Sequence, residues 1–89
     1  MNQTITTTYP KPTPTKRYYV FRSLDRHYPP LETMEYVSRH TQPGTTWDRC
    51  QYLAWKNGND ARDGSVPRYT FYRVHFNQPG RSPEIERYG

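Results

Sequence analysis

The residue types that most often do chemistry in proteins are sparse in this chain. Its 89 residues contain a single cysteine, Cys50, and three histidines, His27, His40 and His75, none close to another along the sequence. A zinc site built from these four is conceivable, but structural zinc sites usually take their ligands from close pairs. We therefore expect surface or strand histidines, and we predict neither a metal nor a cofactor.

Nothing in the sequence favours catalysis. Cys50 falls on the apolar side of an expected helix, where a free cysteine behaves as a small buried hydrophobe rather than as an accessible thiolate. The eight carboxylates are scattered, and Glu32 and Glu35 are one turn apart in another expected helix, over 31–40, where Glu32 near its start complements the helix dipole. The five glycines are isolated, so no phosphate-binding loop is formed. We predict that the protein is not an enzyme and has no catalytic residues.

Arginine and aromatic residues dominate the remaining composition. The formal net charge is +5, ten of the 13 basic residues are arginines, and there are nine tyrosines and two tryptophans. Arginine makes forked contacts with phosphate or carboxylate and stacks on rings, and Arg, Tyr and Trp are enriched at binding hot spots. This composition predicts an anionic partner, either nucleic acid or a host protein complex with an acidic surface.

The length and the composition predict one small α+β domain. Residues 1–15 are rich in Thr and Pro and are expected to form a flexible arm, and 78–89 are expected to form a flexible tail. The compact domain is then 16–77. A lone cysteine excludes an internal disulfide, and no run resembles a signal peptide or a membrane span, so we expect a cytoplasmic protein with no membrane contact. The oligomeric state stays open.

Four elements are expected in the order β-α-α-β, with two short helices against an aromatic-rich antiparallel strand pair. Residues 17–22 ("RYYVFR") and 66–76 ("VPRYTFYRVHF") alternate aromatic and β-branched side chains, which is typical of strands. Tyr18 and Val20 should face one side of the first strand, with Tyr19 and Phe21 on the other. In 31–40, Leu31, Met34 and Val37 recur at helical spacing, which predicts the first helix.

The second helix has the clearest signals. In "TTWDRCQYLAWKNG", Thr45 and Asp48 form a capping box and Asn57-Gly58 is a common helix end, which predicts a helix over 45–57. Its apolar face is predicted to contain Trp47, Cys50, Leu53 and Ala54. Trp55 is eight residues after Trp47 and is expected at the surface.

Two functions are compatible with this pattern. In the first, the helices form a winged helix-turn-helix-like unit, or the strand faces contact bases, and the protein binds nucleic acid or a nucleic-acid-handling complex. In the alternative, it is a small phage or mobile-element protein that inhibits a host enzyme or defence complex by protein–protein binding. Both place binding on the same predicted residues, which are Arg49, Tyr52, Trp55, Lys56, Arg68 and Arg73.

Overall fold

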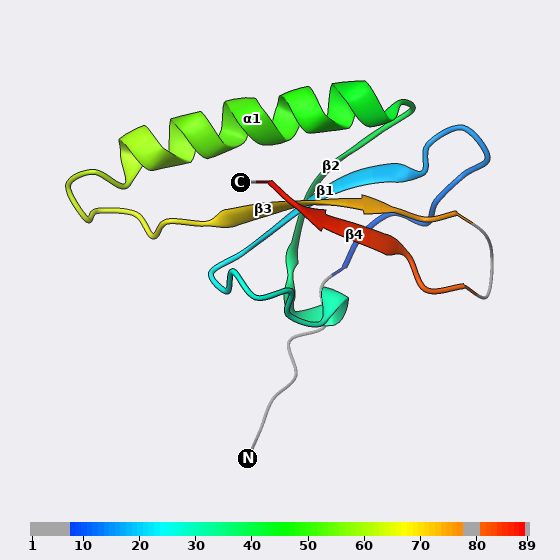
Figure 1. Ribbon diagram of the computed structural model, residues 1–89, viewed down its shortest axis with the longest axis horizontal. Coiled ribbons are helices and arrows are strands. Elements are labelled where there is room, and N and C mark those ends of the chain that lie inside the picture. The colour runs from blue at the N-terminus through cyan, green and yellow to red at the C-terminus, as the bar shows by residue number, and fades with distance from the viewer. Residues whose placement is uncertain (1–7, 78–80, 89) are drawn as a thin grey trace, which may run out of the picture.

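A four-stranded antiparallel sheet carries one long helix across one of its faces (Figure 1). The computed structural model describes residues 8–77 and 81–88. The strand order is β2-β1-β3-β4, with β1 and β3 at the centre. The elements are β1 (Tyr18–Ser23), the 3₁₀ turn η1 (Leu31–Thr33), β2 (Glu35–His40), α1 (Pro43–Asp60), β3 (Thr70–His75) and β4 (Glu84–Arg87).

The alternation of side chains along the central strands gives the sheet two apolar faces. On the helix side, Val20 and Phe71 form a buried cluster with Cys50 of α1. On the opposite side, the largest buried members are Tyr19 and Tyr72. The predicted facing of the side chains of the first strand is confirmed, and the protein is a small single α+β domain.

Residues 31–40 are the main difference from the sequence analysis, because no second helix forms there. After η1 the chain continues as β2, paired antiparallel to β1 with a register shift between Val20 and Phe21. As a helix, this segment would leave the second edge of β1 without a hydrogen-bonding partner. The predicted β-α-α-β order and the helix-turn-helix unit are therefore wrong.

The helix that does form is longer than 45–57. It begins at Pro43, whose fixed backbone angle suits a first helical turn, and Thr46 donates its hydroxyl to the Gln42 carbonyl at 2.7 Å. The side chain of Asn57 does not terminate α1. Its amide oxygen accepts from the Tyr69 N–H at 2.8 Å, and the helix runs on to Asp60.

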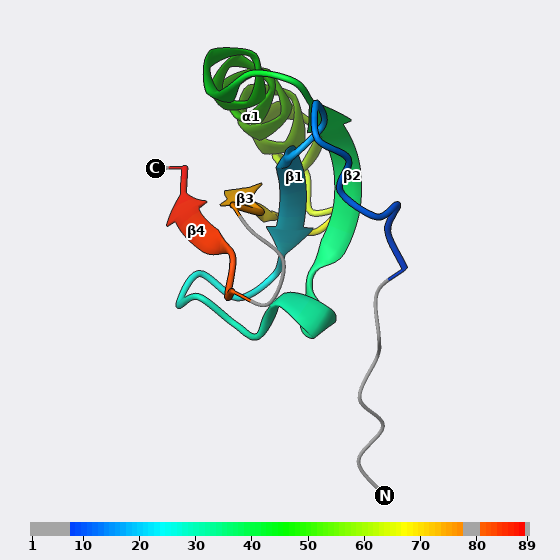
Figure 2. The same ribbon diagram turned by 90° about the vertical axis from the view of Figure 1, so that its right-hand side faces the viewer.

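The described parts of the two terminal segments that were expected to be flexible, 8–15 and 81–88, contribute contacts to the domain, and the remaining residues of those segments lie outside the described part of the chain. Tyr9 packs edge-on against Phe21, with ring centroids 5.3 Å apart, and stacks on Phe76 at 5.7 Å. Tyr19 donates its hydroxyl to the Pro10 carbonyl. Near the C-terminus, β4 pairs with β3. In Figure 2 the described residues before β1, drawn in blue, run past β2 on the side away from α1.

Candidate binding surfaces

Four of the six predicted site residues lie together on the outer face of α1. Arg49, Tyr52, Trp55 and Lys56 are all exposed there. The other two lie elsewhere: Arg68 is in the segment that leads into β3, and Arg73 is on β3 itself. The structure therefore does not bring the six together into one site.

Two aromatic rings on α1 project into solvent. Trp55 is 67% exposed and Tyr52 is 48% exposed, with their ring centroids 6.4 Å apart. The Arg49 guanidinium carbon lies 5.4 Å from the centre of the Tyr52 ring, within cation–π range. We call Arg49, Tyr52 and Trp55 the helix patch. Trp47, by contrast, is partly buried and packs against the helix-side core, as expected.

Two of the predicted cationic contacts are already paired within the protein. Lys56 Nζ lies 3.2 Å from an Asp60 carboxylate oxygen, one turn further along α1. Arg73 forms an ion pair with Glu86 of β4 at 2.6 Å, and its guanidinium lies 4.7 Å from the Trp47 ring. Its side chain is only 21% exposed, and these contacts favour a structural role for Arg73, joining β4 to the start of α1.

The buried strand aromatics are not available as a stacking platform. Tyr19, Phe21 and Tyr72 are fully buried on the sheet face that the N-terminal segment and the loop after β1 cover. Phe71, on the helix side, is 3% exposed. Contact between bases and the sheet faces, one form of the nucleic-acid interpretation, lacks exposed rings on these strands.

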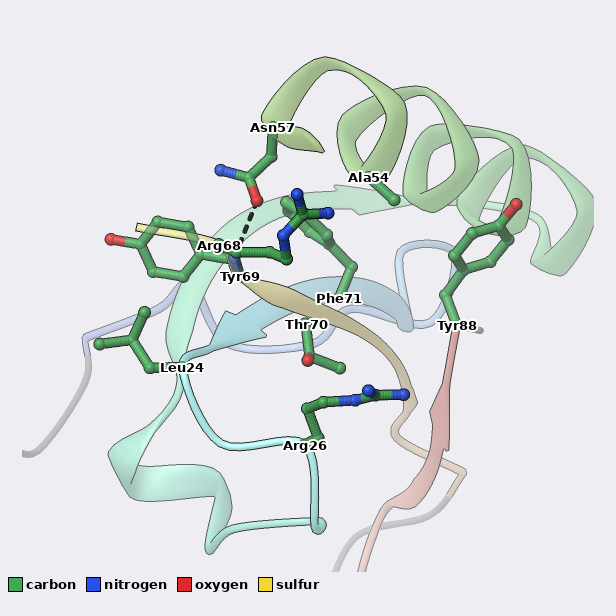
Figure 3. Close-up of a pocket in the computed structure, with 9 residues that line it drawn as sticks. All are labelled: Leu24, Arg26, Ala54, Asn57, Arg68, Tyr69, Thr70, Phe71 and Tyr88. Carbon is green, nitrogen blue, oxygen red and sulfur yellow. Dashed lines mark hydrogen bonds between the residues drawn. The ribbon is translucent and has the colours of Figure 1, made fainter. Parts of the chain in front are cut away.

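A groove that the sequence analysis missed opens beside the C-terminal half of α1. Its volume is about 310 Å³, and α1, the β1–η1 loop, the start of β3 and the chain end after β4 surround it (Figure 3). No local pattern could have indicated it, because its walls come from four separate segments. The lining residues are Leu24, Arg26, Ala54, Asn57, Arg68, Tyr69, Thr70, Phe71 and Tyr88.

Burial shifts the pKa of two titratable groups, the buried Cys50 and the partly buried His40. Burial raises the pKa of the Cys50 thiol to about 12, although the nearby Arg73 opposes the shift. Burial, aided by the charge of Arg49, lowers the pKa of His40, whose Nε2 lies 2.9 Å from the Ser38 hydroxyl. Among residues 8–77 and 81–88, no group of three or more His, Cys, Asp or Glu side chains is arranged to hold a metal ion.

No helix in the described part of the chain has the length and apolar character needed to cross a membrane. No protein-family model matches the sequence, and no curated protein or solved structure matches it significantly.

Proposed function

We propose that this protein is a non-enzymatic binding module that engages a partner protein through the helix patch of α1. The observation that carries the proposal is the exposure of Trp55 and Tyr52 side by side on a rigid helix. Exposed rings of this size are costly in water, and Trp, Tyr and Arg are the side chains that most often dominate protein interfaces.

The geometry supports a protein partner for this face better than a nucleic acid. A DNA-reading helix of the winged class needs a second helix to support it, and here α1 packs on a sheet instead. Lys56 beside the patch is paired with Asp60, which reduces its value as a phosphate contact. Arg49 would pair with an acidic residue of the partner. That residue would lie next to an apolar pocket of the partner that accepts Trp55.

Such a module would act by occupying its partner's surface, because the patch contains no group suited to catalysis. Inhibition of an enzyme or of a defence complex, by covering a surface that it needs, is the form of action we propose.

Affinity capture from a lysate of the source organism tests this, with three versions of the full chain as bait. Trp55→Ala removes the most exposed ring, and Gln51→Ala is the matched control, an exposed residue of the same helix outside the patch. We expect one protein to be retained by wild type and by Gln51→Ala after nuclease treatment, and to be lost with Trp55→Ala.

The captured protein is then titrated with each variant in purified form. Trp55→Ala or Tyr52→Ala should weaken the affinity by about 2 kcal/mol or more, as is usual for interface hot spots. Equal affinity of wild type and Trp55→Ala, or loss of retention on nuclease treatment, would rule out the helix patch as a protein-binding surface.

A further inference from the structure

The groove beside α1 carries two arginines and no acidic side chain. Arg26 comes from the β1–η1 loop and Arg68 from the segment before β3 (Figure 3). Both residues are exposed, and neither forms an ion pair with any residue of 8–77 or 81–88. Two arginines of the sheet differ, since Arg22 and Arg73 are each paired with a glutamate at 2.6 Å. The groove therefore has an uncompensated positive charge.

The backbone on both sides of Arg68 is fixed by one side chain of α1. Asn57 donates its amide N–H to the Pro67 carbonyl at 3.0 Å and accepts from the Tyr69 N–H at 2.8 Å. Arg68 is thus anchored at the residue before it and at the residue after it, so little backbone freedom is lost when its guanidinium binds a ligand.

The loop that carries Arg26 is also held by hydrogen bonds from side chains of the sheet. The Arg87 guanidinium donates to the Arg26 carbonyl, and the Tyr72 hydroxyl donates to the Asp25 carbonyl at 2.6 Å. Tyr28 adopts φ 51°, a left-handed angle uncommon for a tyrosine, and its N–H donates to the Tyr72 hydroxyl at 3.3 Å. Both arginines are therefore presented from backbone that is fixed before any ligand binds.

Aromatic and apolar side chains occupy the space between the charges. Tyr88 lies at one end of the groove, on the chain that leaves β4, with its ring edge-on to Trp47 at 5.3 Å (Figure 3). Leu24 lies at the other end, and Ala54 and Phe71 line the part between. A planar group that carries an anion could pack on the Tyr88 ring while an arginine holds the charge.

We propose that this groove binds a nucleotide unit of a single-stranded nucleic acid, with Arg26 and Arg68 on phosphate and Tyr88 against the base. Arginine on the backbone and an aromatic ring on the base is the combination by which single strands are held without sequence reading. The size of the groove suits one nucleotide. An acidic peptide would satisfy the arginines, but it would leave the ring without a planar partner.

The test is fluorescence anisotropy of a labelled oligouridylate on the full chain at low salt. Arg26→Ala and Arg68→Ala are each expected to weaken binding about tenfold. Arg62→Ala is the matched control, because it removes the same charge from an exposed residue outside the groove, and it should change the affinity less than about twofold. Tyr88→Phe should bind like wild type, and Tyr88→Leu about tenfold more weakly.

Amide chemical shifts on adding the same oligonucleotide locate the site. We expect the largest changes at Thr70 and Phe71, and unchanged binding for Trp55→Ala, so that this inference and the proposed function can fail separately. An equal loss of affinity for Arg62→Ala and Arg26→Ala would show that net charge alone, and not the groove, causes the effect. Hexaglutamate binding more tightly than the oligonucleotide at the same amides would replace the proposed ligand with an acidic peptide. Either result overturns the proposal.

Discussion

At the scale of single residues, the buried thiol is the clearest case of a reactive group made inert. Cys50 is fully buried between α1 and the sheet, and burial raises its pKa to about 12. We predict that the native protein does not react with a thiol reagent at mildly alkaline pH, where an ordinary cysteine is partly ionised. The same reagent should modify Cys50 completely in denaturing guanidinium chloride. Rapid modification of the native protein would contradict the buried placement.

The environment of His40 leads us to expect that the stability of the folded state depends on pH. Burial, aided by Arg49, lowers its pKa in the folded protein below the value it has when unfolded. The unfolded chain therefore binds more protons below about pH 6.5, and the stabilisation present above that pH is lost as the pH falls. We predict a lower Tm at about pH 5 than at about pH 7.

Two variants test whether His40 causes this dependence of the Tm on pH. His40→Gln should make the Tm depend less on pH over that range, whereas the exposed His27→Gln should leave the dependence as in wild type. If both variants keep the full dependence, another group causes it.

At the scale of elements, the N-terminal segment is where the structure differs most from what the sequence predicts. Its Thr and Pro content predicts that residues 1–15 are dispensable for folding. However, Tyr9 packs on Phe21 and Phe76, and the Pro10 carbonyl accepts from the buried Tyr19. A polar, proline-rich segment can cover a sheet face when one aromatic side chain anchors it.

We therefore predict that this segment stabilises the domain. Tyr9→Ala should reduce the free energy of unfolding by about 1–3 kcal/mol, the scale of burying one large apolar side chain. For a domain of this size, each kcal/mol corresponds to a fall in Tm of about 4–8 °C. Lys16→Ala, at an exposed position of the same segment, serves as the control and should melt like wild type. An unchanged Tm for Tyr9→Ala would restore the expectation of a dispensable arm.

At the scale of the whole molecule, the two proposals would divide binding between the aromatic helix patch and the charged groove. We predict that raising the salt from about 50 to 200 mM weakens oligonucleotide binding about sevenfold, as two phosphate contacts on a single strand imply. Protein binding through the helix patch should change far less. A steep salt dependence of patch binding would show that charge, rather than the rings, holds the protein partner.

Local sequence patterns determined much of this protein. The alternation in 17–22 and 66–76 predicted both central strands, and in 17–22 it also predicted the facing of the side chains, because a strand repeats every two residues. The spacing of Trp47, Cys50 and Leu53 predicted the buried face of α1, and it left Trp55 outside. These features depend only on neighbours within a few positions along the chain.

Only the tertiary structure decided the rest, since it depends on what distant segments offer one another. Residues 31–40 fit a helical spacing, but the free edge of β1 makes 35–40 a strand. The segment 84–87 has little strand signal of its own and pairs because β3 presents an edge to it. The same pairing brings Glu86 to Arg73 and Tyr88 to the groove with Arg26 and Arg68. Hydrogen bonding between strands and ion pairing act across space, so no local periodicity records them.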